Sequence, residues 1–528
     1  MGRNGGKQPM MKVVRVAEMR AIEQEADRLG LSYAQMMENA GTNLGKIVDQ
    51  EFRHRTNRSV IGLVGSGNNG GDTLVALAYL AAHEWKAIAY LVKERALDDP
   101  LIQRLLDQGG ILLSAQEDES LQKLRLTLKQ CEVLLDGVLG TGFQLPLKEA
   151  LGKILKTCRE VCQNSPVHVV AVDCPSGVDC DRGEVADEVI PAELTVTMAA
   201  IKAGLLKYPA YPLCGRIVVA DIGLSDHFPI WSKVKRWVID AEWVREHLPI
   251  RSDDSHKGTF GTTFVLAGSE NFTGAAYLAA KAAYLGGCGL VTVGAVRPVY
   301  QALAGQLPEA TWLVLPDEVG FLSQAAAELL INRLNTVDAW VLGPGFGLAE
   351  STSQFVRKIL DSKPERLPPL VVDADGLKLL ARQEGWYRKL PQRSVLTPHP
   401  GEMSVLSGLS VAEIQADRIQ VAERFANQWG QIVVLKGAFT VIADPNGQTA
   451  INPVATSALA RAGSGDVLAG LIGGLLAQGM DNFDAAVAGV WIHSQCGLMA
   501  AESLGTTRCV LASDLFDQIS KVFRDLGR

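Results

Sequence analysis

Residues 461–470, RAGSGDVLAG, combine three glycines and a serine with one aspartate, directly before an apolar stretch. The small residues Gly463, Ser464 and Gly465 leave backbone N–H groups accessible, and at a helix N-terminus such groups bind anions. Asp466 would lie in the first turn of that helix, where a carboxylate either caps the helix or takes a proton from a substrate hydroxyl. The segment is not a Walker P-loop, because the lysine of GxxxxGK[ST] is absent. We therefore predict that the turn binds a phosphoryl group and that Asp466 is a general base.

A second glycine-rich turn, GSGNNGGD at residues 65–72, follows the apolar run SVIGLV. Two other apolar runs also end in polar residues: LLDGVLGTGF contains Asp136, and VVAVDCPSG contains Asp173 and Ser176. The carboxyl ends of parallel strands meet at one edge of a sheet, and hard cations prefer oxygen ligands. Helix capping would explain each aspartate taken alone, but three oxygen-rich strand ends in one sheet favour a binding site. We predict a metal ion held by Asn69, Asp136 and Ser176 in a cleft that Asp173 also lines.

Lys202 stands in MAAIKAGLL, where it is the single charge in an apolar run. It can be a surface lysine whose stem covers apolar neighbours, or a site lysine that faces Asp173. The residues alone leave both interpretations open.

The elements that must position these residues alternate between apolar strands and helical patterns. Residues 13–54 read as helical, and the strands SVIGLV, AIAYLV, VLLDG and VHVVAV follow. A second series begins at GTTFVLAGS and continues through LVTVGAV, AWVLGPGFG, PLVVDADGL, SVLTPHPGE and QIVVLKGAF. Such alternation indicates α/β domains with parallel sheets covered on both faces. We expect two unrelated domains, residues 1–230 and 231–528.

The chain has 528 residues, a formal net charge of −7 and no long basic run. This balance argues against nonspecific binding to nucleic acid or to membranes. The N-terminus lacks the apolar core of a secretion signal, and glycines interrupt the short apolar stretch DVLAGLIGGLLAQGM, so we expect a buried helix there. None of the nine cysteines forms a CxxC pair. We therefore expect a cytoplasmic protein with reduced thiols.

The N-terminal half resembles the NAD(P)H-hydrate epimerase family over residues 15–225, through AEMRAIEQEA, MMENAG, GSGNNGGD, DGVLGTGF, DCPSGVD and IKAGLL. The resemblance implies a Rossmann-like three-layer αβα domain that interconverts the (R) and (S) epimers of hydrated NADH and NADPH (NADHX and NADPHX). It implies K⁺ at the predicted metal site. Two residues depart from the family pattern: Thr73 replaces the usual glycine and Gly137 the usual alanine. The implied substrate contacts are Asn68, Asn69, Gly70, Gly71, Asp72, Gly140, Thr141, Gly142, Phe143, Gln144, Leu145, Pro146 and Asp173.

Epimerisation at the carbon that carries the hydroxyl needs a positioned acid or base. Asp173 is the first candidate and Lys202 the second. The sequence leaves open whether the ring opens or hydroxide leaves.

The second half is similar to the ADP-dependent NAD(P)H-hydrate dehydratase family of the ribokinase superfamily, from about residue 250 to residue 520. The similarity is carried by SHKGTFGTTFVLAGSENFTGAAYLAAKAAYLGGCGLVTV, QLPEA, VLGPGFG, VVDADGL, LTPHPGEM and VLKGAFTVI. It implies a ribokinase-like α/β domain. The implied nucleotide-binding residues are Lys436, Gly437, Ala438, Phe439, Thr440, Gly463, Ser464 and Gly465, and the implied contacts to the hydrated nicotinamide nucleotide are Ala275, Gly345 or Gly347, His399 and Asp466.

There is a chemical reason why a dehydratase would use a kinase-like site. Hydroxide is a poor leaving group, whereas phosphate transferred from ADP to the ring hydroxyl can be expelled by the lone pair of the ring nitrogen. Mg²⁺ would neutralise the phosphates, and Asp373, Asp375 and Glu402 are candidate ligands. The family also implies a homo-oligomer of four or more subunits. The chain's ligands would be NADHX, NADPHX and ADP.

Two other functions compete with this interpretation. The second domain can be an ordinary kinase for a vitamin-like alcohol, with the first domain a non-catalytic scaffold. A dehydrogenase is disfavoured: the GxGxxG spacing occurs at Gly65, Gly67 and Gly70, but no clear ribose-binding acid accompanies it.

Overall fold

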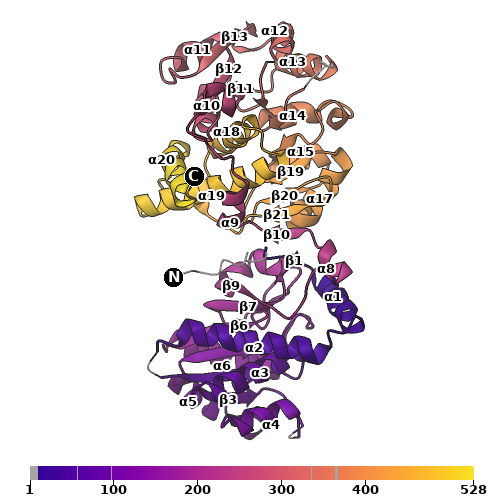
Figure 1. Ribbon diagram of the computed structural model, residues 1–528, viewed down its shortest axis with the longest axis vertical. Coiled ribbons are helices and arrows are strands. Elements are labelled where there is room, and N and C mark those ends of the chain that lie inside the picture. Colours follow the sequence, from indigo (N-terminus) through magenta and orange to yellow (C-terminus); the bar gives the residue numbers. More distant parts are fainter. Residues whose placement is uncertain (1–9, 56, 97, 335, 363–366) are drawn as a thin grey trace. The chain divides into compact units, whose positions relative to one another are not determined.

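The computed structural model describes residues 10–528 except 56, 97, 335 and 363–366. The chain divides into two compact units, residues 1–236 and 237–528, a few residues after the boundary expected from the sequence (Figure 1). Each unit is built around its own sheet. The nine cysteines are all free, and eight of them are buried or partly buried.

The first unit contains a seven-stranded sheet in which every neighbouring pair is parallel. The chain starts at an inner strand, β2, runs outward to one edge, returns to the other side of β2 and continues to the opposite edge. The direction therefore reverses between the first strand and the fourth, β2 and β5, and ligands of such sheets bind outside the carboxyl ends at this switch point. In spatial order the strands are β4 (Ile111–Ser114), β3 (Lys86–Leu91), β2 (Ser59–Val64), β5 (Val133–Gly137), β6 (His168–Val172), β7 (Leu194–Met198) and β9 (Arg216–Ala220).

Two buried apolar clusters cover the two faces of this sheet, because successive side chains of a strand point to opposite faces. On β2, Val60 and Val64 belong to one cluster, whereas Ile61 and Leu63 belong to the other. The predicted three-layer αβα architecture is confirmed. The first cluster includes residues of α1 (Val16–Arg28), α2 (Tyr33–Phe52), α3 (Asn68–Ala82) and α4 (Pro100–Asp107), and the second includes residues of α5 (Gln122–Gln130) and α6 (Glu149–Gln163).

The expectation of helix throughout residues 13–54 is wrong at two places. Val13 and Val14 form a short strand, β1 (Val13–Val14), which pairs in parallel with β8 (Ile201–Lys202). The helix also breaks after Arg28, where Gly30 has a φ of 106°, and restarts at Tyr33. A pairing partner almost 200 residues away is a tertiary interaction that overrides local helical periodicity.

The second unit contains a ten-stranded sheet that is parallel from β13 to β19 and then antiparallel through β20 and β21. This mainly parallel α/β sheet confirms the predicted fold class. In spatial order the strands are β10 (Arg236–Val238), β21 (Thr449–Ile451), β20 (Val441–Ala443), β19 (Ile432–Leu435), β18 (Val395–Leu396), β17 (Leu370–Val372), β16 (Ala339–Leu342), β11 (Thr262–Leu266), β12 (Leu290–Val296) and β13 (Thr311–Leu315).

The glycine-interrupted apolar stretch after residue 463 forms α18 (Ser464–Ala477), a buried helix as expected. Its glycines allow close approach to α10 (Thr273–Leu285): a Cβ on Gly470 would lie 2.1 Å from the carbonyl oxygen of Ala279, and one on Gly474 would lie 2.4 Å from that of Ala283. On its other side α18 contacts α19 (Asn482–Leu504). Across the described part of the chain, no helix combines the length and apolarity that a bilayer crossing requires.

Candidate active sites

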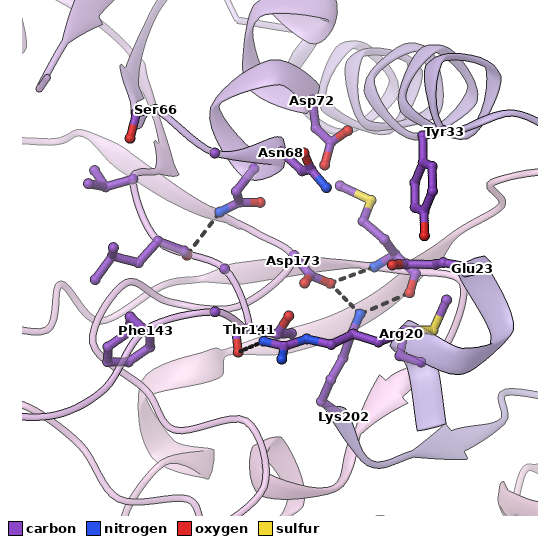
Figure 2. A pocket seen from close by; sticks show the side chains of 18 of the residues that line it. Arg20, Glu23, Tyr33, Ser66, Asn68, Asp72, Thr141, Phe143, Asp173 and Lys202 are labelled. Atoms are coloured by element: carbon purple, nitrogen blue, oxygen red, sulfur yellow. Dashed lines mark hydrogen bonds and ion pairs between the residues drawn. The ribbon is translucent and has the colours of Figure 1, made fainter. Parts of the chain in front are cut away.

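The first site is a cavity of about 750 Å³ at the carboxyl ends of β2 and β5 (Figure 2). It lies at the switch point of the sheet, where the turn GSGNNGGD leads into α3 and the loop after Asp136 follows β5. Of the predicted residues, those that line the cavity are Asn68, Asn69, Asp72, Gly140, Thr141, Gly142, Phe143, Asp173 and Lys202.

Polar groups beneath this cavity are tightly connected. The backbone N–H and the hydroxyl of Ser176 donate to the two carboxylate oxygens of Asp136 at 2.8 and 2.6 Å. The Asn69 amide nitrogen donates to the carbonyl of Leu139 at 2.9 Å, which leaves Asn69 Oδ1 facing the other way. This oxygen is buried and has no hydrogen-bond partner among the described residues. An orphaned amide oxygen beside buried oxygen ligands is what a hard cation would satisfy.

The two departures from the family pattern touch each other. A Cβ on Gly137 would lie 1.8 Å from Thr73 Oγ1, so an alanine cannot be placed there while threonine occupies position 73. Thr73 is fully buried, and its hydroxyl donates to the carbonyl of Asn69 at 2.7 Å. The larger Thr73 on α3 and the smaller Gly137 on β5 therefore compensate each other. The hydrogen bond from Thr73 to the Asn69 carbonyl links this pair to a predicted metal ligand.

Asp173 and Lys202 form a buried ion pair, which excludes the surface alternative for the lysine. Asp173 Oδ1 accepts hydrogen bonds from Lys202 Nζ, the Thr197 hydroxyl at 3.1 Å and the Met198 backbone N–H at 3.0 Å. Lys202 Nζ also donates to the Met198 carbonyl at 2.9 Å. Asp173 itself has a φ of 66°, a left-handed conformation that is uncommon for residues other than glycine and that clusters at functional sites.

Two further carboxyl groups share the cavity with Asp173. Burial raises the pKa of Asp72 well above its usual range, and the nearby charges of Asp173 and Glu23 add to that rise. Burial also raises the pKa of Glu23, with the Asp173 charge acting in the same direction against Lys202. Figure 2 shows the side chains of Glu23, Asp72 and Asp173 converging on one space.

Sequence reasoning missed Glu23 and its neighbour Arg20. Both come from α1 and line the cavity, and Arg20 Nη2 lies 3.4 Å from the carbonyl of Thr141. Their signal was an acidic residue and a basic residue on the helix that carries AEMRAIEQEA, but that helix reaches the site only through tertiary packing.

Five other predicted substrate contacts lie outside the lining of this cavity. Gly70 and Gly71 are buried in the first turn of α3, where a Cβ on Gly70 would lie 2.0 Å from the Gly65 carbonyl oxygen and one on Gly71 would lie 2.6 Å from Met37 Sδ. Their lack of a side chain allows the turn and α2 to pack closely against the helix start. The remaining three, Gln144, Leu145 and Pro146, continue the loop beyond Phe143.

The second site lies at the N-terminus of α18. Gly463 precedes the helix with a φ of 88°, and Ser464, Gly465 and Asp466 form its first turn. The backbone N–H groups of a first helical turn have no partners within the helix, which makes them donors for an anion. The Ser464 hydroxyl donates to the carbonyls of Leu459 and Arg461 at 2.8 and 2.9 Å, so it holds the turn itself.

The ends of two strands, β17 and β19, and the first turn of α15 (Pro400–Ser407) contribute charged groups beside this turn. Lys436, directly after β19, donates to Asp373 Oδ1 at 2.6 Å and lies 3.8 Å from Glu402 Oε2. A Cβ on Gly465 would lie 3.3 Å from both Asp373 Oδ2 and Lys436 Nζ, so the turn and the ion pair are in contact. Burial alone would lower the pKa of Lys436, but the charges of Asp373 and Glu402 outweigh it and raise that pKa.

Burial and the neighbouring charges raise the pKa of Asp466 to about 7. Burial is the largest cause and the Asp373 charge the next, while the Lys436 charge opposes both. A carboxyl group with a pKa near neutrality suits a general base that must be ionised before reaction and protonated after it.

The predicted nucleotide segment Lys436–Thr440 is the turn between β19 and β20. Gly437 has a φ of 143° and Phe439 one of 53°, and the Thr440 hydroxyl donates to the Gly437 carbonyl at 2.9 Å. Gly437 and Ala438 are exposed, whereas Phe439 and Thr440 are buried. The turn therefore presents small residues to solvent beside the Lys436 ammonium group.

The residues expected to contact the nicotinamide part fall into two groups. A Cβ on Gly345 would lie 2.7 Å from the Ala275 Cβ, so these two residues are adjacent, and Gly347 donates its N–H to Asp375 Oδ2 at 3.0 Å. His399 caps α15 (Pro400–Ser407): its Nδ1 accepts from the N–H groups of Gly401 and Glu402. With Nδ1 occupied, Nε2 of His399 faces Glu402 Oε1 at 3.3 Å.

His493 is a residue that sequence reasoning did not find. It lies in α19, is buried, and its Nε2 is 2.8 Å from the carbonyl oxygen of Ser464. Nothing in the sequence around it, GVWIHSQCG, differs from an ordinary apolar helix with one polar position.

Known proteins match both units. A family model described as NAD(P)H-hydrate dehydratase matches residues 263–521, and one described as YjeF-related protein N-terminus matches residues 33–204. The bifunctional NAD(P)H-hydrate repair enzyme Nnr of Moorella thermoacetica is 36% identical, with 98% of this chain and 97% of that protein covered. The protein of the same name from Salinibacter ruber is 34% identical, with 94% of each covered. Among solved structures, ADP/ATP-dependent NAD(P)H-hydrate dehydratase from Bacillus subtilis, co-crystallised with ATP/Mg²⁺, is 33% identical, covers 55% of this chain and 98% of its own, and has a TM-score of 0.48.

Proposed function

The chain belongs to the family of bifunctional NAD(P)H-hydrate repair enzymes, and from that premise we propose how its two sites divide the work. It is an enzyme that interconverts the epimers of hydrated NADH and NADPH and dehydrates the (S) epimer at the expense of ADP. We assign epimerisation to residues 1–230 and dehydration to residues 231–528. Relatives that match almost the whole chain carry this name, which does not favour a kinase fused to a non-catalytic scaffold.

In the dehydratase site, Asp466 acts as the general base. The ring hydroxyl oxygen forms a bond to the β-phosphorus of ADP, the bond from that phosphorus to the bridging oxygen breaks, and AMP leaves while Asp466 keeps the hydroxyl proton. The lone pair of the ring nitrogen then expels phosphate. Loss of a proton from the neighbouring carbon restores the dihydropyridine.

The observation that carries this assignment is the position of Asp466, a carboxyl group with a pKa of about 7, in the turn that contacts the Lys436–Asp373 pair. Gly465 lies against the Lys436–Asp373 pair, and Asp466 follows it with a pKa of about 7. Lys436 supplies positive charge for the nucleotide phosphates, and the N–H groups of the turn supply donors for the transferred group. His399, Ala275 and Gly345 or Gly347 would contact the hydrated nucleotide.

Mg²⁺ fits this site only as an ion shared with the nucleotide. The described residues hold no cluster of three or more His, Cys, Asp or Glu side chains that could bind a metal by themselves. Asp373 is bonded to Lys436 and Thr397, and Asp375 to Gly347 and Lys378. Mg²⁺ commonly takes one or two carboxylates, several waters and substrate phosphates, so Asp373 or Asp375 would complete its shell when ADP is bound.

In the epimerase site, the environments of two aspartates suit opposite roles. Asp173 Oδ1 accepts three hydrogen bonds that hold its carboxylate in place, and we assign it the role of base; burial raises the pKa of Asp72 well above its usual range, which suits a proton donor. Lys202 holds the Asp173 carboxylate and is the second candidate to contact the hydroxyl. This division serves hydroxide loss and ring opening equally, because each needs one proton given and one removed.

The residues beneath this cavity fit K⁺. Asn69 Oδ1 needs a partner, and the Asp136 carboxylate and the Ser176 hydroxyl are the oxygens of the neighbouring strand ends. A bound K⁺ would supply positive charge that orders the two turns which line the substrate cavity.

The test of this function uses both epimers of NADHX with the full-length protein. Without ADP, chromatography should show the two epimers interconverting and no recovery of NADH absorbance. With ADP and Mg²⁺, both epimers should be converted to NADH, with AMP and phosphate released in equal amounts. A stable phosphorylated product with no NADH would instead identify a kinase.

A further inference from the structure

The buried imidazole of His493, on α19, contacts the anion-binding turn at the start of α18. His493 stands in α19, which packs against α18, and it is 7% exposed. Its Nε2 lies 2.8 Å from the Ser464 carbonyl oxygen, and a carbonyl oxygen can only accept, so Nε2 carries the hydrogen. Burial lowers the pKa of His493 to about 4, so the ring is neutral at neutral pH.

The Ser464 carbonyl shares a peptide plane with the N–H of Gly465. Because a trans peptide is planar, its C=O and N–H point in opposite directions, and whatever fixes one direction fixes the other. The Ser464 hydroxyl already holds this residue from the side of Leu459 and Arg461. His493 holds the same residue from the opposite helix, so the Gly465 N–H is aimed away from α19.

Gly465 itself lies beside the charged groups at the strand ends. A Cβ on Gly465 would lie 3.3 Å from Lys436 Nζ and from Asp373 Oδ2. The charges of Lys436 and Asp373 also act on His493, which places the imidazole close behind the same cluster. The chain of contacts runs from α19 through one peptide plane to the strand ends.

We propose that His493 is a positioning residue of the dehydratase, which orients the Gly465 N–H toward the phosphoryl group in transfer. This inference rests on the proposed function of the second unit. His493 does not touch the substrate; it acts through the Ser464–Gly465 peptide. Donors aimed at charge that develops in the transition state act mainly on kcat, since ground-state binding uses them less.

The test compares His493→Leu, His493→Gln and Ser494→Ala in the full-length enzyme. Leucine removes the donor, and glutamine keeps an N–H donor at a similar reach. Ser494 is the matched control, because it is a buried polar residue of the same helix whose hydroxyl donates to the Trp491 carbonyl at 2.8 Å, away from the turn. Circular dichroism and thermal unfolding of each variant show whether the second unit has folded, because the epimerase residues belong to the other unit.

We expect His493→Leu to lower the dehydratase kcat at least about tenfold, while the KM for ADP changes less than about threefold. His493→Gln should regain most of that loss, and Ser494→Ala should keep the wild-type kcat. A general base with a pKa of about 7 makes the rate fall below neutral pH, and this fall should persist in the glutamine variant, since His493 does not titrate near pH 7. The epimerase rate should be unchanged throughout.

A His493→Leu kcat within about threefold of wild type would overturn the inference, as would an equal loss in Ser494→Ala or a glutamine variant as slow as the leucine variant. A wild-type enzyme that phosphorylates without dehydrating would overturn the proposed function first. The two failures are therefore distinguishable.

Discussion

Replacing Asp466 by asparagine removes the proposed base while it keeps the shape of the side chain. Asparagine can occupy the first turn of α18 as aspartate does, so the N–H groups of Gly465 and its neighbours stay in place. A general base contributes about 10²- to 10⁴-fold to rate. We expect Asp466→Asn to lose dehydration by that factor and to keep epimerisation, since the epimerase residues belong to the other unit.

The pH dependence of the dehydratase rate gives a second quantitative prediction for Asp466. With a pKa of about 7, roughly half of Asp466 is ionised at pH 7, about a tenth at pH 6 and about nine tenths at pH 8. Only the ionised form can take the proton, so the wild-type kcat/KM for the hydrated nucleotide should fall about fivefold from pH 7 to pH 6, about tenfold per pH unit below that, and level off above pH 8. The dehydratase rate of the Asp466→Asn variant should show no such change with pH near 7. The assay is NADH absorbance under saturating ADP and Mg²⁺.

The same pKa makes a prediction about stability. The Asp466 pKa rises from 3.8 in the unfolded chain to about 7 in the folded one, so its contribution is lost as pH rises through that window. At pH 8 the ionised side chain costs the fold about 4 kcal/mol relative to a neutral one. Asp466→Asn should therefore unfold at a higher temperature than wild type at pH 8, and the gap should close toward pH 4.

Two results would refute this assignment of Asp466. An Asp466→Asn variant with more than about a tenth of wild-type activity and an unchanged pH dependence would show that another group takes the proton. Loss of both activities in a folded variant would show that the two sites are not independent.

The remaining predictions concern the first unit. Asp173→Asn should lower epimerisation by about 10²-fold or more, measured by chromatography of the two epimers, and should leave dehydration of the (S) epimer intact. Replacing K⁺ by tetramethylammonium should slow epimerisation alone, and Asn69→Ala should make the enzyme indifferent to K⁺; an equal K⁺ response in that variant would contradict the site. Gly137→Ala should destabilise the fold by about 1–3 kcal/mol in denaturant unfolding, since its Cβ would meet Thr73 Oγ1, and Thr73→Gly should relieve that loss. Additive effects of the two changes would show that they do not interact.

The sequence predicts the strand ends better than it predicts what surrounds them. Asp136 and Asp173 each stand at the end of an apolar run, and a parallel sheet must bring the ends of such runs to one edge, whereas Asp466 follows a glycine-rich turn at the start of an apolar helix. The sequence left the pairing of Asp173 with Lys202 as one of two alternatives, because the lysine lies on the short strand β8, whose pairing partner β1 is almost 200 residues away.

Glu23 and His493 lie beyond that reasoning for a physical reason. Each sits on a helix whose own pattern is ordinary, and each meets its site across a packing interface between elements far apart in the chain. The exchange between Thr73 and Gly137 was visible as two separate departures, but only the Cβ geometry shows that they compensate. Local periodicity carries no information about such contacts.

The central claim is that the turn before α18 holds the transferred phosphate within reach of Asp466. A crystal structure of Asp466→Asn with ADP, Mg²⁺ and the (S) epimer of NADHX tests it directly. The β-phosphate should lie within about 3 Å of the Gly465 N–H, and the ring hydroxyl should lie a similar distance from residue 466. A phosphate chain bound elsewhere, with the ring hydroxyl far from that residue, would contradict the claim.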